Sequence, residues 1–371
     1  MSNIWLISSD SHVMEPPDLW ETRVDKRYRN RTPTVVTEED ADYWFIDGVR
    51  AMSFQGGAQT GRRFDDPQRL STQARWDEVR EGSYVAQEFV NDNRADSVDV
   101  SFVYPTLGLF LFNIPSQEIV TASCRAYNDW IIDFCAPFPD ALKGLAMINM
   151  DEVPEAIEEL ERAHQRGLVG AMITVYPPED RAYDLSMYDP FWEAAESLAM
   201  PLSFHIGTNR SAPGQGMPFL ETPLAKDIAA DYWLRVSLAN MIFAGVFERY
   251  PNLKVISTEH DLNWAPMLLG RMDYTYTQRH RGVALPRFRN GMMPSDFFHR
   301  NVFLSFQEDP VGIRERDLIG VDNLMWGSDY PHQESTFPKS REVTDRILEG
   351  VPEDERMKIL RGNVARVYNL E

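Results

Sequence analysis

The feature that most constrains the fold is a regular alternation of short apolar runs with segments of helical periodicity. Eight apolar runs have the length of strands: Ile4–Ile7, Val98–Tyr104, Leu142–Asn149, Val169–Val175, Leu202–His205, Leu253–Glu259, Val302–Phe306 and Asn323–Gly327. Helices are expected between them at Ser116–Ala136, Val153–Arg166, Tyr188–Ala199, about Leu224–Arg249 and Trp264–Arg279, and after Ser340 and Pro352. Buried strands that alternate with helices predict a parallel sheet, and eight such units predict a (β/α)8 TIM barrel.

A doubly wound open sheet is the alternative architecture. It would need a Gly-rich phosphate-binding turn after the first strand, and the sequence has none there. We therefore expect one barrel over residues 1–371, with an irregular insertion over residues 24–85. The insertion contains a predicted hairpin at Tyr43–Arg50 and a Gly-rich piece at Gln55–Arg63. An insertion this long is typically a lid or an oligomer contact, and the alternative interpretation is a loop that is simply exposed to solvent.

Composition narrows the choice of partners. The chain has 37 basic and 57 acidic residues, a net charge of −20, which argues against nucleic acid or an anionic membrane. The two cysteines, Cys124 and Cys135, lack CxxC spacing and are expected to be reduced core thiols of a cytosolic protein. No stretch resembles a signal peptide or a membrane span. The expected partner is a small-molecule substrate, and the expected compartment is the cytoplasm.

Imidazole and carboxylate groups gather at the ends of four predicted strands. These residues are Asp10, His12, Glu15, His205, Glu259, His260, Asp329 and His332. The other three histidines, His164, His280 and His299, fall in helical or connecting segments and are expected at the surface. Each strand-end residue alone could be an ordinary capping or core residue, but the joint pattern is hard to explain that way. Such residues on the rim of a barrel supply the mixed nitrogen and oxygen ligands that zinc or a similar ion prefers.

At these strand ends the chain resembles a known family. Asp10-Ser11-His12, the strand ends at His205 and His260, and the sequence WGSDYP at 326–331 resemble the amidohydrolase superfamily. The likeness is closest to the amidohydrolase-related branch that contains the aminocarboxymuconate-semialdehyde and γ-resorcylate decarboxylases. The resemblance implies four metal ligands, Asp10, His12, His205 and Asp329. It also implies that His260 is the catalytic acid or base, or a further ligand, and that Asp329 additionally orients or deprotonates water or substrate.

Two departures from the family bear on the number of metals. The fourth strand, 171–176, has no Lys that could be carboxylated to bridge two ions, which favours one divalent metal. We expect zinc first, with manganese or iron as alternatives. Asp10 stands where the family more often has His or Glu. Glu15, Glu259, His260 and His332 could nevertheless complete a second site without a Lys, as in dinuclear-iron oxygenases built on this fold.

Several functions remain open on this basis. The favoured ones are decarboxylation or hydrolysis of a small carboxylate-containing substrate. An oxygen-activating hydroxylase with two Fe ions or a Mn/Fe pair is the alternative enzyme, and a catalytically silent oligomer partner is the alternative outside catalysis. The candidate substrate-binding residues are Arg210, Arg62 or Arg63, Trp264 and Tyr330. By analogy we expect a homo-oligomer, a dimer, or a pairing with a related subunit.

Overall fold

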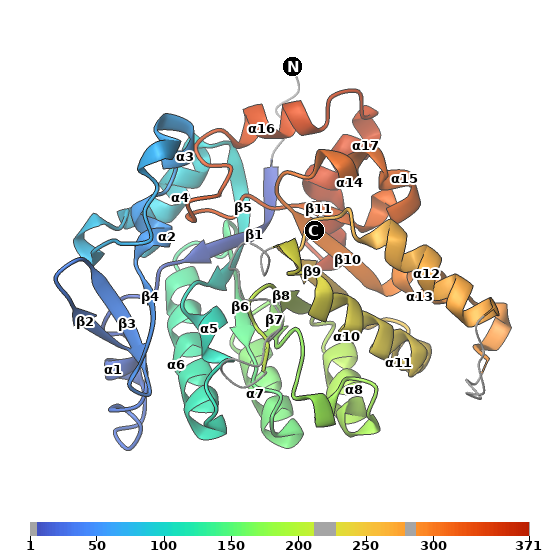
Figure 1. Ribbon diagram of the computed structural model, residues 1–371, viewed down its shortest axis with the longest axis horizontal. Helices are drawn as coiled ribbons and strands as arrows, with labels where there is room; N and C mark the ends of the chain where they lie inside the picture. The colour runs from blue at the N-terminus through green and yellow to red at the C-terminus, as the bar shows by residue number, and fades with distance from the viewer. Residues whose placement is uncertain (1–5, 211–227, 279–286, 371) are drawn as a thin grey trace.

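Eight parallel strands surround the centre of the molecule in the computed structural model, which describes residues 6–210, 228–278 and 287–370 (Figure 1). The strands are β1 (Leu6–Val13), β5 (Val98–Pro105), β6 (Leu142–Met147), β7 (Gly170–Ile173), β8 (Leu202–His205), β9 (Val255–Thr258), β10 (Val302–Phe306) and β11 (Leu324–Trp326). They pair in sequence order, β1-β5-β6-β7-β8-β9-β10-β11. A doubly wound sheet would reverse its order part-way. The predicted barrel is therefore confirmed.

The nearly closed barrel is joined at the seam between β1 and the segment after β11. The backbone N–H of Asp329 donates to the carbonyl of Asp10 over 2.9 Å, and the N–H of His12 donates to the carbonyl of Tyr330. Two buried serines of β1 also reach across: Ser8 Oγ lies 3.0 Å from Ser328 Oγ, and Ser9 Oγ donates to the Trp326 carbonyl over 2.9 Å. These serine hydroxyls are thus buried with partners, as buried polar groups generally are.

The first strand differs from its prediction. We expected it to end at Ile7, yet β1 continues to Val13 and pairs with β5 up to Pro105. The polar residues after Ile7 stay in the strand because their backbone and hydroxyl groups find partners on both neighbouring segments. Ile4 and Trp5 lie outside the described residues.

Helices lie outside the strands (Figure 1). The main ones are α4 (Ala86–Ala95), α6 (Gln117–Cys135), α7 (Val153–Gln165), α8 (Asp189–Ser197), α10 (Tyr232–Phe243), α11 (Val246–Arg249), α12 (Ala265–Gln278), α13 (Pro294–Asn301), α14 (Pro310–Arg314), α15 (Arg316–Ile319), α16 (Ser340–Ile347), α17 (Glu353–Met357) and α18 (Asn363–Val367). The helix predicted over 224–249 is divided where Gly245 takes a φ of 71° between α10 and α11. The beginning of that prediction, and Arg279 and His280, lie outside the described residues.

The insertion forms its own small sheet beside the barrel. Strands β2 (Thr34–Thr37), β3 (Asp42–Ile46) and β4 (Val49–Ser53) pair antiparallel, which confirms the predicted hairpin. Its turn residues, Asp47 and Gly48, both have positive φ, as a tight two-residue turn requires. The Gly-rich piece forms the short helices α2 (Gln55–Ala58) and α3 (Arg62–Asp65).

The core thiols are where we expected them. Cys124 and Cys135 are buried and not joined in a disulfide. Across the three described ranges, no helix is long and apolar enough to cross a membrane.

Candidate active site

The four predicted ligands meet at the carboxyl ends of the strands. His12 Nε2 lies 3.2 Å from His205 Nε2, 3.3 Å from Asp10 Oδ1 and 3.4 Å from Asp329 Oδ1. Asp10 and His12 come from β1, His205 from the end of β8 and Asp329 from the turn after β11, where it takes a φ of 58°. All four are buried. Period 2 along β1 turns Asp10 and His12 to the same side, which is why the sequence could pair them.

The hydrogen bonds of the two histidines decide which ring nitrogens are free. His12 Nδ1 lies 2.7 Å from the Pro105 carbonyl, and His205 Nδ1 lies 3.0 Å from the Ile206 carbonyl. Because a carbonyl only accepts, both Nδ1 atoms carry the proton and both Nε2 atoms present lone pairs to each other. Burial, and then the charge of His332, lower the pKa of His12, which favours the neutral ring. Two facing lone pairs beside two carboxylates repel each other unless a cation lies between them.

The spacing of Asp10, His12, His205 and Glu259 fits one metal ion, since one ligand atom of each lies within 4.8 Å of the others. Asp329 adjoins this group through His12 and through Glu259. Ligands about 2.1 Å from a shared ion lie roughly 3.0 Å apart at right angles and roughly 3.4 Å apart at tetrahedral angles. The observed separations of 3.2, 3.3 and 3.4 Å from His12 Nε2 fall in that range. Asp10 Oδ1 and Asp329 Oδ2 are buried without a hydrogen-bond donor among the described residues. These atoms are therefore available as ligands without rearrangement.

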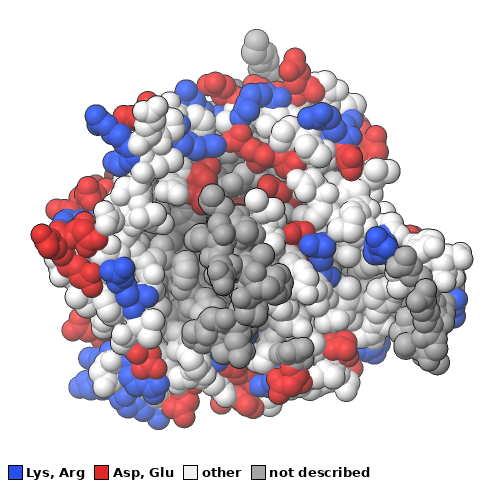
Figure 2. Space-filling view, viewed as in Figure 1, with Lys and Arg blue, Asp and Glu red and all other residues white. Residues whose placement is uncertain are grey.

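Further carboxylates surround this group. Glu259 Oε2 lies 3.3 Å from His205 Nε2, and Glu259, Asp329 and Glu334 can bring one oxygen each within 4.8 Å of one another. Burial, followed by the charges of Asp329 and Asp10, raises the pKa of Glu259 well above its ordinary value. Figure 2 shows acidic side chains above the centre of the visible face. Glu334 could not be predicted as part of this group, since it lies in a loop where no periodicity indicates the direction of its side chain.

Glu15 does not join the ligands, so its prediction as part of a second metal site is wrong. Its Oε1 accepts from the N–H of Gly108 over 2.9 Å, and its Oε2 accepts from Leu107 over 2.9 Å and from Thr106 over 3.3 Å. The carboxyl group thus binds the start of α5 (Gly108–Leu111). Burial raises the pKa of Glu15 to about 7 against the effect of these N–H donors.

His332 lies beside the ligand group with both nitrogens in use. Its Nδ1 is 2.8 Å from Asp329 Oδ1, and its Nε2 is 2.9 Å from Thr106 Oγ1. Burial alone would lower the pKa of His332, but the Asp329 carboxylate outweighs it and raises the pKa to about 9. His332, His12 and Asp329 can each bring one ligand atom within 4.8 Å of the others, so the predicted role of His332 at a second ion stays a prediction. Its two polar neighbours also make it a partner of Asp329.

His260 differs from His332 in having no carboxylate partner in the described part of the chain. Its Nδ1 lies 3.4 Å from Ser257 Oγ, and its buried Nε2 has no partner there. Burial, and then the nearby His205, lower the pKa of His260 to about 3. The residue therefore presents a neutral imidazole next to the ligands, which agrees with the acid–base role implied by the family resemblance.

The structure gives Arg210 a different role from the predicted one. Its Nε and Nη2 donate to the Asp151 carboxylate over 3.0 and 2.6 Å, and its Nη1 donates to the carbonyls of Phe112 and Ile114. Both members of the ion pair are buried. The guanidinium is fully engaged inside the fold, so the prediction that it binds substrate is wrong.

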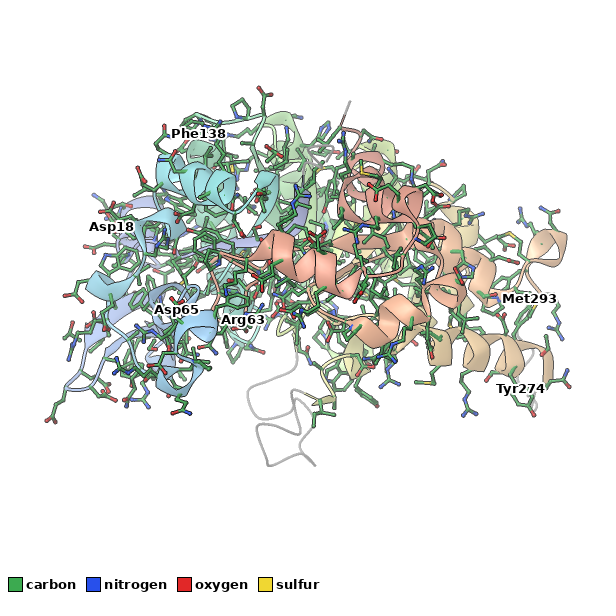
Figure 3. All side chains as sticks on the ribbon, turned by 90° about the horizontal axis from the view of Figure 1, so that it is seen from above. Asp18, Arg63, Asp65, Phe138, Tyr274 and Met293 are labelled. Carbon is green, nitrogen blue, oxygen red and sulfur yellow. The ribbon has the colours of Figure 1, made fainter. Side chains whose placement is uncertain are left out.

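Of the other predicted substrate-binding residues, Arg63 and Tyr330 bind partners within the fold, whereas Trp264 lies near the site. Arg63 is paired with Glu308 and donates to the Ser335 carbonyl over 2.7 Å, on the side of α3 that faces α16 (Figure 3). Tyr330 is buried, and its hydroxyl donates to Asp92 over 2.5 Å, so it too holds structure together. Trp264 lines a hollow of 580 Å³ together with His260 and Glu259, and keeps its predicted place near the site.

A smaller cavity of 210 Å³ lies beside the ligands. Its described lining residues are Met52, Gln55, Gly56, Thr106, Leu109, Phe110, Ile206, Gly207, Glu259, His332, Gln333 and Glu334. It shares Ile206 and Glu259 with the hollow that contains His260. Three lining residues, Met52, Gln55 and Gly56, come from the insertion, whose role as a lid or an oligomer contact stays a prediction. No sequence signal pointed to these three, because their contacts depend on how the insertion folds back.

Comparison with known proteins decides the family. Residues 69–370 match the family model Amidohydro_2, described as Amidohydrolase. The chain belongs to this family. The resemblance inferred from the sequence is thereby confirmed, and the chain is an enzyme of the amidohydrolase superfamily, a hydrolase or carboxy-lyase, rather than a silent oligomer partner.

Individual relatives agree with this placement. The chain is 26% identical to a γ-resorcylate decarboxylase from Rhodococcus jostii (strain RHA1) over 279 residues, which are 70% of this chain and 80% of that protein. An amidohydrolase from Mycobacterium avium subsp. paratuberculosis K-10 shares the fold at a TM-score of 0.79 and 21% identity, with 99% of this chain and 100% of that chain covered.

A third comparison concerns a protein crystallised with a metal. The 5-carboxyvanillate decarboxylase of Novosphingobium aromaticivorans, complexed with manganese and 4-hydroxy-3-methoxy-5-nitrobenzoic acid, matches at a TM-score of 0.71 and 17% identity. The match covers 100% of this chain and 97% of that chain. The oxygen-activating alternative finds no support in these relatives.

Proposed function

We propose that this enzyme is a decarboxylase of a small carboxylic acid that depends on one divalent metal ion. The observation that carries the proposal is the pair of unprotonated Nε2 atoms of His12 and His205, which lie 3.2 Å apart. The first faces Asp10 at 3.3 Å and Asp329 at 3.4 Å, and the second faces Glu259 at 3.3 Å. The named activities of the Rhodococcus and Novosphingobium relatives support decarboxylation. The cavity of 210 Å³ suits a single ring with small substituents, since a cavity of about 150 Å³ accepts benzene.

The metal would be held by Asp10, His12, His205 and Asp329, with Glu259 as a fifth donor. When bound, it would polarise a substrate oxygen and stabilise the negative charge that remains as carbon dioxide leaves. A donor set with three carboxylates and two imidazoles suits manganese at least as well as the zinc expected from the sequence. Manganese in the Novosphingobium relative points the same way.

His260 is the proposed proton-directing group: its imidazole is neutral at rest, so it can take up a proton at Nε2 and pass it to the substrate carbon. In a non-oxidative decarboxylation the carbon–carbon bond breaks, its electron pair remains on the substrate carbon, and a proton must reach that carbon. The buried Nε2 of His260 has no partner among the described residues, and Glu259 connects its hollow with the smaller cavity. A neutral imidazole in this place can relay a proton to the substrate carbon.

Hydrolysis of an amide, lactone or ester is the second candidate. The Oδ2 atom of Asp329 favours it, because it is buried beside the ligands without a donor in the described ranges and could take a proton from water. The two reactions differ in their products. Release of carbon dioxide from one of a panel of hydroxy- and amino-substituted aromatic acids supports the first, and release of acid from an uncharged lactone or amide supports the second.

A variant pair tests the role of His260. We expect His260→Ala to retain about one manganese per chain while kcat falls roughly 10²- to 10⁴-fold, the usual contribution of a general acid or base. His164→Ala is the control, since His164 is exposed on α7. Metal content by elemental analysis and turnover are measured on the same samples. Loss of metal together with activity would make His260 a ligand, and a wild-type protein that binds no divalent metal would overturn the proposed function.

A further inference from the structure

His332 lines the cavity of 210 Å³, contacts the predicted ligands His12 and Asp329, and lies beside Gly56 of the insertion. Its ring stacks on the ring of His12, with centroids 4.1 Å apart and planes inclined by 30°. Its Nδ1 lies 2.8 Å from Asp329 Oδ1, the same oxygen that faces His12 Nε2 at 3.4 Å. His332 therefore touches two ligands without pointing a free nitrogen at the place between them.

The second nitrogen fixes the direction of the ring. His332 Nε2 lies 2.9 Å from Thr106 Oγ1, in the segment that follows β5. The backbone N–H of His332 also donates to the Asp329 carbonyl over 2.9 Å. Stacking on one face and a polar neighbour at each nitrogen orient the ring, and its Nδ1 lies against the Asp329 oxygen that faces His12.

Helix α2 of the insertion approaches the ring of His332 closely. A Cβ atom built on Gly56 of α2 would lie 3.3 Å from His332 Cδ2 and 3.6 Å from Met14 Sδ. Four residues further on, Thr60 Oγ1 donates to the Pro331 carbonyl over 2.6 Å, next to His332 in the chain. The absence of a side chain at position 56 lets the backbone of the insertion come close to the imidazole.

We propose that His332 is a positioning residue through which the insertion holds Asp329 ready to bind the metal. The inference rests on the proposed metal-dependent function. Partners of this kind, which orient a ligand without binding the ion, typically change metal affinity about 10- to 100-fold when they are removed. His332 would thus set metal affinity, and the insertion would influence it through Gly56, which lies far from His332 in the sequence.

Manganese affinity of the chelator-treated full-length chain, measured by calorimetry, tests the proposal. His332→Phe keeps an aromatic ring over His12 but removes both polar contacts, and we expect the dissociation constant to rise about 10- to 100-fold. His332→Gln can still donate to Asp329 and should recover part of the loss. His164→Phe makes the same change at an exposed histidine of α7, is the control, and should stay within about twofold. Should His332→Phe fail to fold, Thr106→Val removes the Nε2 partner instead and should weaken binding in the same direction.

A second pair of variants tests whether the insertion affects manganese binding through His332. Gly56→Val places a Cβ 3.3 Å from His332, whereas the Cβ of Gly270→Val on α12 meets nothing within 4 Å apart from the adjoining backbone of its own helix. We expect several-fold weaker manganese binding only for Gly56→Val, with circular dichroism confirming that both variants are folded. A wild-type chain that binds no manganese would refute the proposed function itself. Wild-type affinity in His332→Phe would refute the positioning role alone, and wild-type affinity in Gly56→Val would refute the link to the insertion.

Discussion

At the scale of single residues, each buried polar side chain near the strand ends takes its role from the partner that it meets. Asp10, His12, His205 and Asp329 could be predicted together because strand period and strand order place them at one end of a barrel. Arg210 and Glu15 stand at equally suggestive positions, yet their partners are Asp151 and the backbone of residues 106–108. Such partners lie far away in the sequence, and no local pattern points to them.

The buried Arg210–Asp151 pair leads to a prediction at this scale. We expect Arg210→Met to lower the free energy of unfolding by about 3 to 5 kcal/mol, because it leaves Asp151 buried and unpaired. Urea unfolding measures the loss. At a temperature where the variant is folded, KM should stay close to the wild-type value, since the guanidinium has no donor left for a substrate.

An exposed ion pair provides the control for this substitution. Arg23 and Asp133 lie 2.8 Å apart at the surface, with 31% and 58% of their side chains exposed. Arg23→Met should cost no more than about 1 kcal/mol. A large rise in KM in Arg210→Met without loss of stability would restore Arg210 as a substrate ligand and contradict its role as the buried partner of Asp151.

At the scale of elements, the strands and outer helices could be predicted because burial repeats with a fixed period. The length of β1 and the path of the insertion could not. β1 extends through Ser8, Ser9 and Ser11 because their hydroxyl groups find Ser305 and Ser328 on the far side of the seam. The insertion forms a cavity wall only after its helices α2 and α3 fold back on the segment after β11, and no periodic pattern encodes that contact.

The contact between the end of α4 and the start of α16 predicts how stability depends on pH. Asp96 follows α4 and accepts from the N–H of Ser340, at the start of α16, over 2.9 Å, and from its hydroxyl. Burial raises the pKa of Asp96 to about 6, against the effect of these donors. Because the folded state favours the protonated acid, this stabilising contribution is complete below the unfolded value of 3.8 and is lost as the pH rises through about 6.

Asp96→Asn removes that titration and leaves an amide that can still bond to Ser340. Urea unfolding of both proteins at intervals from about pH 4 to about pH 7 is the measurement. We expect the stability of the wild type relative to the variant to fall by about 2 to 3 kcal/mol over this interval. Parallel pH profiles for the two proteins would show that Asp96 does not titrate in this range.

At the scale of the whole molecule, the family and the barrel fold both indicate an active site at the carboxyl ends of the strands. The oligomeric state stays a prediction. A dimer, or a pairing with a related subunit, was expected by analogy, and light scattering in solution measures it directly. The negative charge of the chain is locally concentrated as well. Glu259 belongs to one group of possible ligands with Asp10 and to another with Asp329 and Glu334, so a cation there would relieve repulsion between segments far apart in sequence.

Metal removal therefore should affect the stability of the entire barrel. A ligand at about 100 times its dissociation constant adds about 2.7 kcal/mol to the free energy of unfolding, provided that it binds the folded state alone. We expect chelation to lower the melting temperature by a few degrees and added manganese to restore it in a concentration-dependent way. Asp329→Asn should remove that response, because it deletes a carboxylate shared by two of the possible ligand groups. His164→Ala should keep it. An unchanged melting temperature over a wide range of manganese concentrations would mean that the facing lone pairs of His12 and His205 are stabilised by something other than a divalent ion.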